Sequence, residues 1–249
     1  MDMFGDLIIN INEGDLLNQH FGMIGIRKLL SIAENPPIQA VIDAGLVPKM
    51  IQYVKQLEYP QLQLEATWAL TNVASGTTIQ CQSIIDKGGI PLFVELLKSN
   101  NNGIVEQAVW AIGNISSDCV FYRDNIIRAG GLINLVEATR RLTDEGLIKH
   151  CCWALSNLCR GSPLPKYDHI RHAIPILCQA IAQGKINDKE ITADCCWAIS
   201  YHSDSNRNKI QVVVDSGVLP RIVKNLEEPA MGLLIPSIRI LGNISTGSV

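Results

Sequence analysis

The sequence is poor in aromatic residues and lacks the segments that mark membrane or secreted proteins. Aromatic side chains make up 5% of its 249 residues, so its core must be built from aliphatic side chains. No apolar run reaches the length of about 18 residues that a membrane-spanning helix needs. The first residues, MDMFGDLIIN, have neither the basic start nor the long apolar stretch of a signal peptide. We therefore expect neither a membrane span nor a secretory leader.

An excess of positive charge is also missing. The chain has 21 Lys and Arg against 24 Asp and Glu, for a formal net charge of -3. This balance is a poor match to nucleic acid and a better match to a basic partner. The eight cysteines include no CxxC pair, which leaves a zinc ribbon or thioredoxin motif without support. We expect reduced thiols in the core of a cytosolic or nuclear protein.

Tryptophan is scarce, yet all four copies stand in versions of one phrase: EATWALTNVASG, QAVWAIGNISSD, HCCWALSNLCRG and DCCWAISYHSDS. They are Trp68, Trp110, Trp153 and Trp197, and the steps between them are 42, 43 and 44 residues. A second phrase, VIDAGLVP from Val41, recurs from residues 84, 126 and 213, with a degraded copy, DHIRHAIP, from residue 168. Two phrases with one period indicate a repeat protein.

Each repeat has the pattern of three helices. A short helix ends at a glycine that can take the left-handed conformation, and a proline fits the first turn of the next helix. The tryptophan phrase lies on a long third helix, and no segment alternates with period two. The sequence predicts an all-α protein: a right-handed α-solenoid of about six armadillo repeats, three helices each, in a single domain over residues 1–249. The expected repeats are approximately 6–36, 37–77, 78–118, 119–162, 163–205 and 206–247.

The terminal repeats depart from the pattern. In the first, Ile26 falls at the tryptophan place and Leu30 at the asparagine place; in the last, Arg239 replaces tryptophan while Asn243 is kept. The last phrase is followed almost at once by the end of the sequence at Val249, although a solenoid normally ends in a polar cap. We therefore expect the chain to be part of a longer solenoid.

The helical period separates two faces of the tryptophan helix. With Trp68 at 0°, Asn72 lies at about 40°. The small aliphatic residues of the phrase lie at about 100° to 200°, and they are Ala66, Ala69, Leu70 and Val73. The same separation recurs around Trp110 and Trp153. The aliphatic stripe should face the core, and the Trp–Asn stripe should be partly exposed on a concave surface, where it forms a ladder with rungs about 10 Å apart.

Such a ladder suits an extended basic peptide. An asparagine side chain can bond both the N–H and the C=O of a peptide backbone. An indole face attracts Lys or Arg through cation–π contact and packs against their apolar stems. Asp118, four residues past Asn114, and Asp194, three before Trp197, can add charge-assisted contacts. The ligand we expect is an extended peptide rich in lysine and arginine.

The phrases WALTNVASGT, EQAVWAIGN, WALSNLCR and DCCWAISY resemble the armadillo domain of importin alpha (karyopherin alpha), the adaptor that carries proteins with classical nuclear localisation signals, along nearly the whole chain. The resemblance implies that Trp68, Trp110 and Trp153 form slots for basic side chains and that Asn72, Asn114 and Asn157 hold the peptide backbone. It implies that Trp197 and Tyr201 extend the array and that Asp118 pairs with the key lysine of the signal. Further binding positions that it implies are Ser75, Gly76, Thr77, Gln107, Arg160 and Asp194.

This chain also departs from the family's pattern. His150 stands where a binding asparagine is usual, Cys81 where a threonine is usual, and Ile32 where an arginine is common. The resemblance implies that the basic segment that binds importin beta in the family lies outside residues 1–249, as does most of the second, minor binding site. The resemblance therefore implies that this chain binds monopartite signals, that importin beta is a partner of the full-length protein, and that the protein shuttles between cytoplasm and nucleus.

Two other classes of function remain as alternatives. An enzyme is disfavoured because the sequence has no P-loop, GxSxG or HExxH motif, and we expect neither a metal nor a cofactor. An armadillo scaffold for other protein partners shares the repeat but generally lacks regular Trp-to-Asn rungs. A third reading is a divergent importin alpha with weak signal binding, because of His150 and Cys81.

Overall fold

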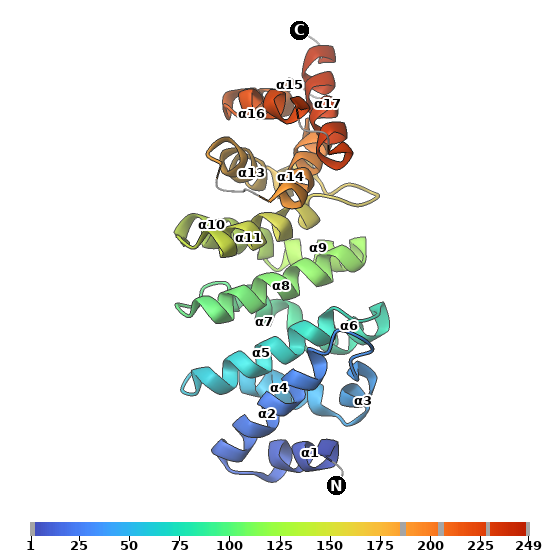
Figure 1. Ribbon diagram of the computed structural model, residues 1–249, viewed down its shortest axis with the longest axis vertical. Coiled ribbons are helices and arrows are strands. Elements are labelled where there is room, and N and C mark those ends of the chain that lie inside the picture. Colours follow the sequence, from blue (N-terminus) through green and yellow to red (C-terminus); the bar gives the residue numbers. More distant parts are fainter. Residues whose placement is uncertain (1–2, 185–187, 204–206, 228–229, 248–249) are drawn as a thin grey trace. The chain divides into compact units, whose positions relative to one another are not determined.

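The computed structural model describes residues 3–184, 188–203, 207–227 and 230–247, and over these ranges the chain forms helices and no strand (Figure 1). The all-α prediction is confirmed. The chain divides into two compact units, Met1–Asp118 and Cys119–Val249. In the parts of the chain that the structure describes, no helix is both long enough and apolar enough to cross a bilayer.

The first unit contains eight helices in its described residues. They are α1 (Met3–Glu13), α2 (Leu16–Leu30), α3 (Ile38–Asp43), α4 (Leu46–Val54), α5 (Pro60–Ala74), α6 (Thr78–Ile85), α7 (Gly89–Leu96) and α8 (Asn102–Asp118). The second and third expected repeats thus hold three helices each. The prediction of three is wrong for the first repeat, where residues 6–36 provide only α1 and α2. The chain runs from α2 to α3 without a further helix, through the Pro36–Pro37 pair, which disfavours helical backbone before it.

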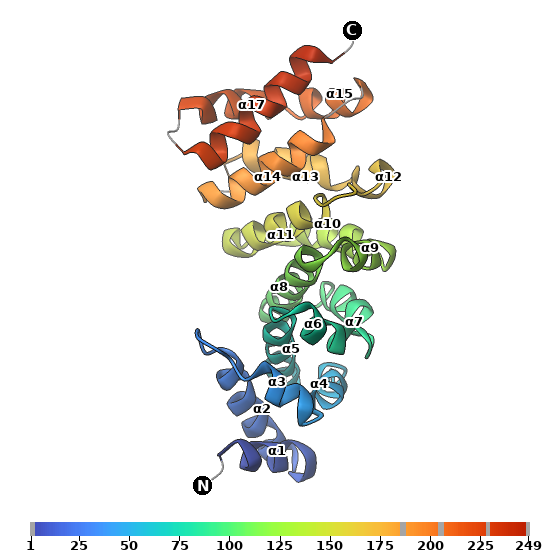
Figure 2. The same ribbon diagram turned by 90° about the vertical axis from the view of Figure 1, so that its right-hand side faces the viewer.

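The long helices of this unit form one layer. Helix α5 packs against α2 on one side and α8 on the other, while α4 packs on α5 and α7 on α8. Figure 2 shows α5 and α8 following one another, with α4 and α7 together beside them. The buried residues between these helices are mainly Leu, Ile, Val, Ala and Met, as the low aromatic content requires. Burying one such large aliphatic side chain contributes about 1.5–3 kcal/mol.

Glycines mark the joints between the first and second helices of most repeats. Gly45, Gly88, Gly130 and Gly217 have φ of 70°, 81°, 85° and 72°, in the left-handed region. The helices that follow carry Pro48, Pro91 and Pro220 in their first turns. Both features were predicted from the second repeated phrase, and both are confirmed.

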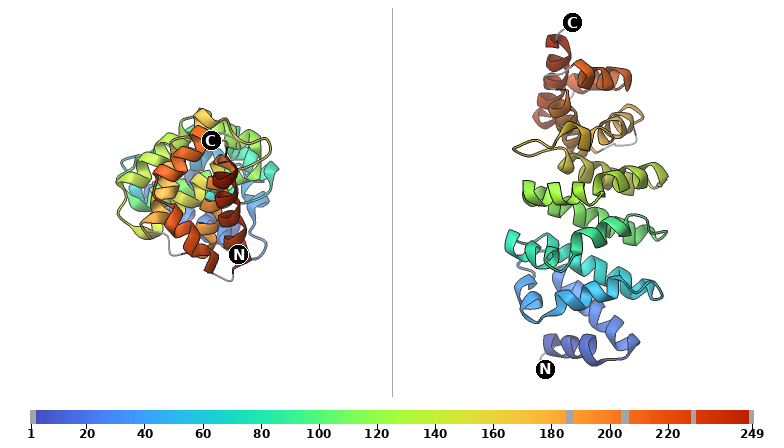
Figure 3. Two further views of the ribbon diagram at one scale, coloured as in Figure 1. Left: turned by 90° about the horizontal axis from the view of Figure 1, so that it is seen from above. Right: turned by 180° about the vertical axis from the view of Figure 1, so that it is seen from behind.

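The second unit continues the pattern in its described residues. Its helices are α9 (Val120–Arg128), α10 (Gly131–Arg141), α11 (Glu145–Leu158), α12 (Tyr167–Ile170), α13 (Ala173–Ala182), α14 (Lys189–His202), α15 (Arg207–Asp215), α16 (Leu219–Lys224), a 3-10 turn η1 (Asn225–Glu227) and α17 (Met231–Thr246). The degraded phrase at residue 168 corresponds to a helix, α12, of four residues. Figure 3, from behind, shows the long helices α14 (orange) and α17 (dark red), which pack against each other.

The cysteines lie inside the two units, as expected. All eight are free thiols; Cys119 is partly exposed and the other seven are buried. Burial raises the pKa of the Cys159 thiol to about 12, because the charged thiolate is poorly solvated there. Such thiols are protonated at neutral pH and therefore unreactive.

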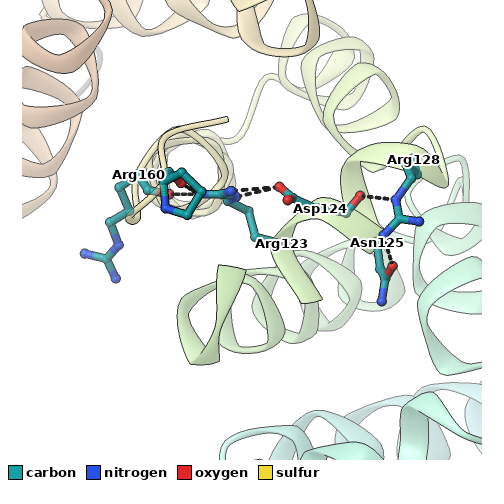
Figure 4. A network of polar contacts seen from close by, with 6 residues as sticks. Arg123, Asp124, Asn125, Arg128 and Arg160 are labelled. Carbon is teal, nitrogen blue, oxygen red and sulfur yellow. Dashed lines mark hydrogen bonds and ion pairs between the residues drawn. The ribbon is translucent and has the colours of Figure 1, made fainter. Parts of the chain in front are cut away.

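A buried arginine fixes the loop that follows α11. Arg123 is 1% exposed, and its Nη1 donates to the carbonyls of Arg160 at 2.7 Å and Pro163 at 2.9 Å. Its Nε and Nη2 lie 2.9 and 2.8 Å from Asp124 Oδ1. Figure 4 shows this network and the Arg160 side chain pointing away from it. Gly161, between the two accepting residues, has a φ of 117°, and a Cβ there would lie 2.5 Å from Arg123 Nη1.

We expect Gly161→Ala to lower the free energy of unfolding by about 2 kcal/mol or more, because alanine is strained at this φ and its methyl group would displace a guanidinium that four contacts hold in place. Chemical denaturation measures the change. Gly232→Ala is the control: a Cβ there meets nothing within 4 Å, and in a helix alanine is favoured over glycine by up to about 1 kcal/mol. Equal effects of the two substitutions would contradict this account of the loop.

A histidine is buried at the end of α14. His202 is 2% exposed, and its ring centroid lies 5.0 Å from that of Tyr167. Burial, with a smaller effect from the charge of Lys209, lowers the pKa of His202 from 6.5 to about 4. The folded protein therefore keeps this imidazole neutral at a pH where the unfolded chain has already bound a proton.

The stability that depends on neutral His202 is present above pH 6.5 and is lost as the pH falls toward 4. Between pH 7.5 and 5 we expect it to account for a loss of about 2 kcal/mol in the free energy of unfolding, measured by denaturation at each pH. His202→Phe should flatten this dependence, whereas the exposed His172→Gln should leave it as it is. An unchanged pH dependence in His202→Phe would show that other groups cause it.

Candidate peptide-binding site

The two faces predicted for the tryptophan helices are present in both units. The aliphatic stripe of α5 is fully buried: Ala66, Ala69, Leu70 and Val73 are all 0% exposed. Trp68 and Asn72 on the same helix are partly exposed, as are Trp153 on α11 and Trp197 on α14. Trp110 on α8 is 38% exposed, more than the other three tryptophans. The predicted division between a core face and a partly exposed Trp face is confirmed.

The first rung of the ladder, Trp68 and Asn72, is contacted by Arg27 of α2 and by Ser31, the residue that caps the end of α2. The Arg27 guanidinium carbon lies 4.5 Å from the centre of the Trp68 ring, and Arg27 Nε lies 2.7 Å from Glu65 Oε2. Asn72 Nδ2 donates to Ser31 Oγ at 3.0 Å. Ile26, which aligns with the tryptophan position, is fully buried, so it is Arg27, the next residue, that reaches the ladder. Arg27 and Ser31 were not among the residues predicted from the sequence, although their spacing of four residues puts them on one helix face.

The second rung, Trp110 and Asn114, stands beside a carboxylate. Asp118 follows Asn114 by one turn of α8 and is partly exposed, and its Oδ1 accepts a hydrogen bond of 2.8 Å from Thr78 Oγ1. Its Oδ2 is buried and has no hydrogen-bond partner among the described residues. A buried carboxylate oxygen without a donor is unfavourable. Thr78 was not predicted from the sequence, because only the fold brings the start of α6 to the end of α8.

The loop before Thr78 brings three further predicted residues to the same end of α8. Thr77 caps α6 in a capping box with Gln80, and Gly76 precedes it in the chain. Ser75 is exposed, and its Oγ donates to the Asn72 carbonyl at 2.8 Å.

Gln107 is one turn before Trp110 and is partly exposed, and its backbone carbonyl accepts from Thr71 Oγ1 at 3.0 Å. The first unit thus gathers nine of the predicted site residues: Trp68, Asn72, Ser75, Gly76, Thr77, Gln107, Trp110, Asn114 and Asp118.

One predicted position is buried where exposure was expected. Asn157 on α11 is 0% exposed, so in this structure its side chain is not open to a ligand. The matching asparagines inside each unit also have protein partners. Asn72 donates to Ser31, and Asn243 donates to the Ser200 carbonyl at 2.9 Å and to Ser203 Oγ at 3.2 Å.

The remaining predicted residues lie in the second unit. The rings of Trp197 and Tyr201 are stacked 5.6 Å apart, and the Arg239 guanidinium carbon lies 5.2 Å from the Tyr201 ring. Arg160 is exposed at the end of α11. Asp194 is partly exposed; burial raises its pKa, and the positive charge of Arg160 opposes that shift. His150, which replaces the usual asparagine, is partly exposed on α11.

Over the described ranges, no three His, Cys, Asp or Glu side chains are grouped as metal ligands would be. What the partly exposed face offers is aromatic rings, amides and single carboxylates. Those groups bind cations and backbone amides by contact and hydrogen bonding.

The chain is similar in sequence and in fold to proteins already known. The family model of the armadillo/beta-catenin-like repeat matches residues 34–75 and 78–117. Importin subunit alpha-1a of Oryza sativa subsp. japonica is 45% identical over 89% of this chain and 41% of its own length. Importin subunit alpha-4 of Arabidopsis thaliana is 47% identical over 88% of this chain and 40% of its own, and importin subunit alpha-B of Dictyostelium discoideum is 43% identical over 96% and 46%.

Among solved structures, a designed armadillo repeat protein in complex with the peptide (KR)4 matches with a TM-score of 0.79 and 24% identity, over 98% of this chain and 100% of that one. An engineered protein matches with a TM-score of 0.82 and 25% identity, over 100% and 98%. The chain spans less than half the length of the curated relatives it matches. The repeats, the fold and the sequence agree: the chain contains armadillo repeats, has the fold of designed armadillo repeat proteins and is similar in sequence to importin alpha subunits.

Proposed function

We propose that this chain is the signal-binding part of a nuclear import adaptor, and that the exposed face of α8 holds a lysine- and arginine-rich localisation signal in extended conformation. The observation that carries the proposal is the set Trp110, Asn114 and Asp118. These residues follow one another at intervals of four on α8 and therefore share one face. Together they offer an indole ring for a cation–π contact, an amide that can hydrogen-bond a peptide backbone, and a negative charge.

Asp118 is the residue on which lysine selection depends. Thr78 holds one carboxylate oxygen and leaves Oδ2 without a donor among the described residues. A lysine ammonium has three donors and no acceptor, so it can supply the missing hydrogen bond and neutralise the charge at the same time. The stem of that lysine would lie along the Trp110 indole, as lysine stems do on apolar surfaces.

The wider array extends the proposal to Trp68, Asn72, Ser75, Gly76, Thr77 and Gln107 in the first unit and to Trp153, Asn157, Arg160, Asp194, Trp197 and Tyr201 in the second. Asn157 joins only if its side chain leaves the buried position it has here. The names of the relatives, importin alpha subunits, support the assignment to nuclear import. The proposal includes binding without catalysis, importin beta as a partner of the full-length protein, and shuttling between cytoplasm and nucleus.

A fluorescence-polarisation titration with a short lysine-rich signal peptide tests the proposal. We expect Asp118→Asn to weaken binding by about 10- to 100-fold, because a hydrogen bond to a charged group contributes about 1.5–3 kcal/mol. Asp118→Lys should abolish binding, and a peptide with its key lysine changed to threonine should lose affinity for the wild type to a similar degree as the Asn variant.

The exposed Asp43 provides the matched control, since Asp43→Asn removes the same charge from the same unit without touching α8. It should leave the affinity within about twofold in moderate salt, where exposed charges are screened. The proposal would be contradicted if both peptides bound equally, if Asp118→Asn had no effect, and if modest salt abolished binding. The protein would then be a scaffold for other partners whose only affinity for the peptide is its general acidity.

A further inference from the structure

The two units of the chain differ in charge. Residues 1–118 carry 6 Lys and Arg against 12 Asp and Glu, and residues 119–249 carry 15 against 12, so the formal net charges are -6 and +3. The cations of the second unit are concentrated in one place: four of the seven residues in KYDHIRH, from Lys166 to His172, are Lys, Arg or His, against the single Asp168. A charge distribution of this kind draws ligands of opposite sign to one part of a surface.

The fold adds two cations of α15 to those of this segment. Lys209 Nζ lies 5.4 Å from the centre of the Tyr167 ring, within the range of a cation–π contact, so the start of α15 lies beside α12. Figure 2 shows α12 and α15 on the same side of the second unit. Lys209 is partly exposed, and the other basic residues here are exposed. We call the set the α12 surface: Lys166, His169, Arg171, His172, Arg207 and Lys209.

The cations of the α12 surface are not neutralised by the part of the chain that the structure describes. The four ion pairs found in that part join other residues. One of them shows the contrast within the same unit, because Lys149 Nζ lies 2.6 Å from Asp188 Oδ2. Asp168, the carboxylate inside the segment, is exposed and is outnumbered by the basic side chains around it. Like charges gathered in this way repel one another, so an anionic partner is favoured.

The backbone that carries the α12 surface is held in place from beneath. Just before it, Arg123 donates to the carbonyls of Arg160 at 2.7 Å and Pro163 at 2.9 Å. Within it, the Tyr167 ring lies 5.0 Å from the ring of the buried His202. Because these contacts already order the segment, a ligand that binds its side chains does not have to pay the entropic cost of ordering its backbone.

We propose that the α12 surface is a docking site for an acidic protein segment, one rich in aspartate and glutamate. The inference goes beyond the proposed function and does not depend on it, since no residue of this surface lies on a tryptophan helix. The cations suit carboxylates. Arg171 and Arg207 offer planar guanidinium groups for bidentate pairs, and Lys166 and Lys209 offer ammonium groups as point charges.

Nucleic acid is a poorer match to the same surface. A duplex carries one negative charge for about every 1.7 Å of its length, and binding proteins neutralise many phosphates at once. The cations here are confined to residues 166–172 and the start of α15, and the first unit of the chain has a net charge of -6. A short acidic segment can use the local cluster without meeting an extended basic track, which a long polyanion would need.

Fluorescence polarisation of a short glutamate-rich peptide with the full chain, at two salt concentrations, tests the proposal. We expect the double variant Lys166→Gln with Arg171→Gln to weaken binding by about 3- to 10-fold, because each exposed ion pair contributes modestly to the affinity. Binding by wild type should also weaken as salt is added. Both side chains are exposed, so the substitutions remove charge without disturbing the core.

The double variant Arg221→Gln with Lys224→Gln is the matched control. It removes two positive charges from α16 in the same unit, outside the α12 surface. It should leave the affinity within about twofold, because separated exposed charges are screened in moderate salt. An equal loss in the two double variants would show that only the general charge of the unit attracts the peptide. That result, or a wild type that does not bind the peptide at all, would overturn the inference.

Two further measurements decide where the peptide binds and whether the ligand is a protein segment. In an NMR titration, the backbone amide resonances of residues 166–172 and 207–209 should shift while those of α16 stay in place; shifts confined to other residues would contradict the proposal. A single-stranded oligonucleotide of the same net charge should bind more weakly than the peptide. If it bound more tightly and lost affinity in Lys166→Gln with Arg171→Gln, the surface would be a nucleic-acid site and the proposal would be wrong.

Discussion

Close packing of small aliphatic side chains between successive long helices is the constraint on which the rest of this structure depends. Ala66, Ala69 and Leu70 on α5 are completely buried, and α5 packs between α2 and α8. Small residues let helices approach closely enough to exclude water along their length. The opposite face of α5 and of α8 carries the recurring Trp and Asn, which are at least partly exposed there.

The structure makes the rungs chemically unequal although the sequence repeats them. At the first rung, Arg27 and Ser31 already contact the ring and the amide. At the last, Arg239 stacks on Tyr201, so an arginine meets an aromatic ring near each end of the series. The second rung differs because Asp118 stands beside it with one carboxylate oxygen lacking a donor in the described part of the chain. Contacts made by residues such as Arg27, Ser31 and Thr78, which lie outside the repeated phrase, thus make the rungs different.

The period, the helical class and the buried stripe were predictable, because each is a local property that recurs every 42 to 44 residues. The contacts that distinguish the rungs were not. Arg27 and Trp68 are 41 residues apart, as are Ser31 and Asn72, and no periodic signal specifies such pairs. Burial of Asn157 was missed as well, because helical angles place this residue on the Trp face and do not show how deeply the fold buries a side chain there.

The most direct test of the central claim, that the exposed face of α8 holds a basic peptide, is a crystal structure of this chain with a lysine-rich peptide. The account predicts an extended peptide with one lysine stem against the Trp110 indole and its ammonium on Asp118 Oδ2. It also predicts backbone contacts to Asn114. A peptide bound away from α8, or one whose lysines avoid Asp118, would contradict it.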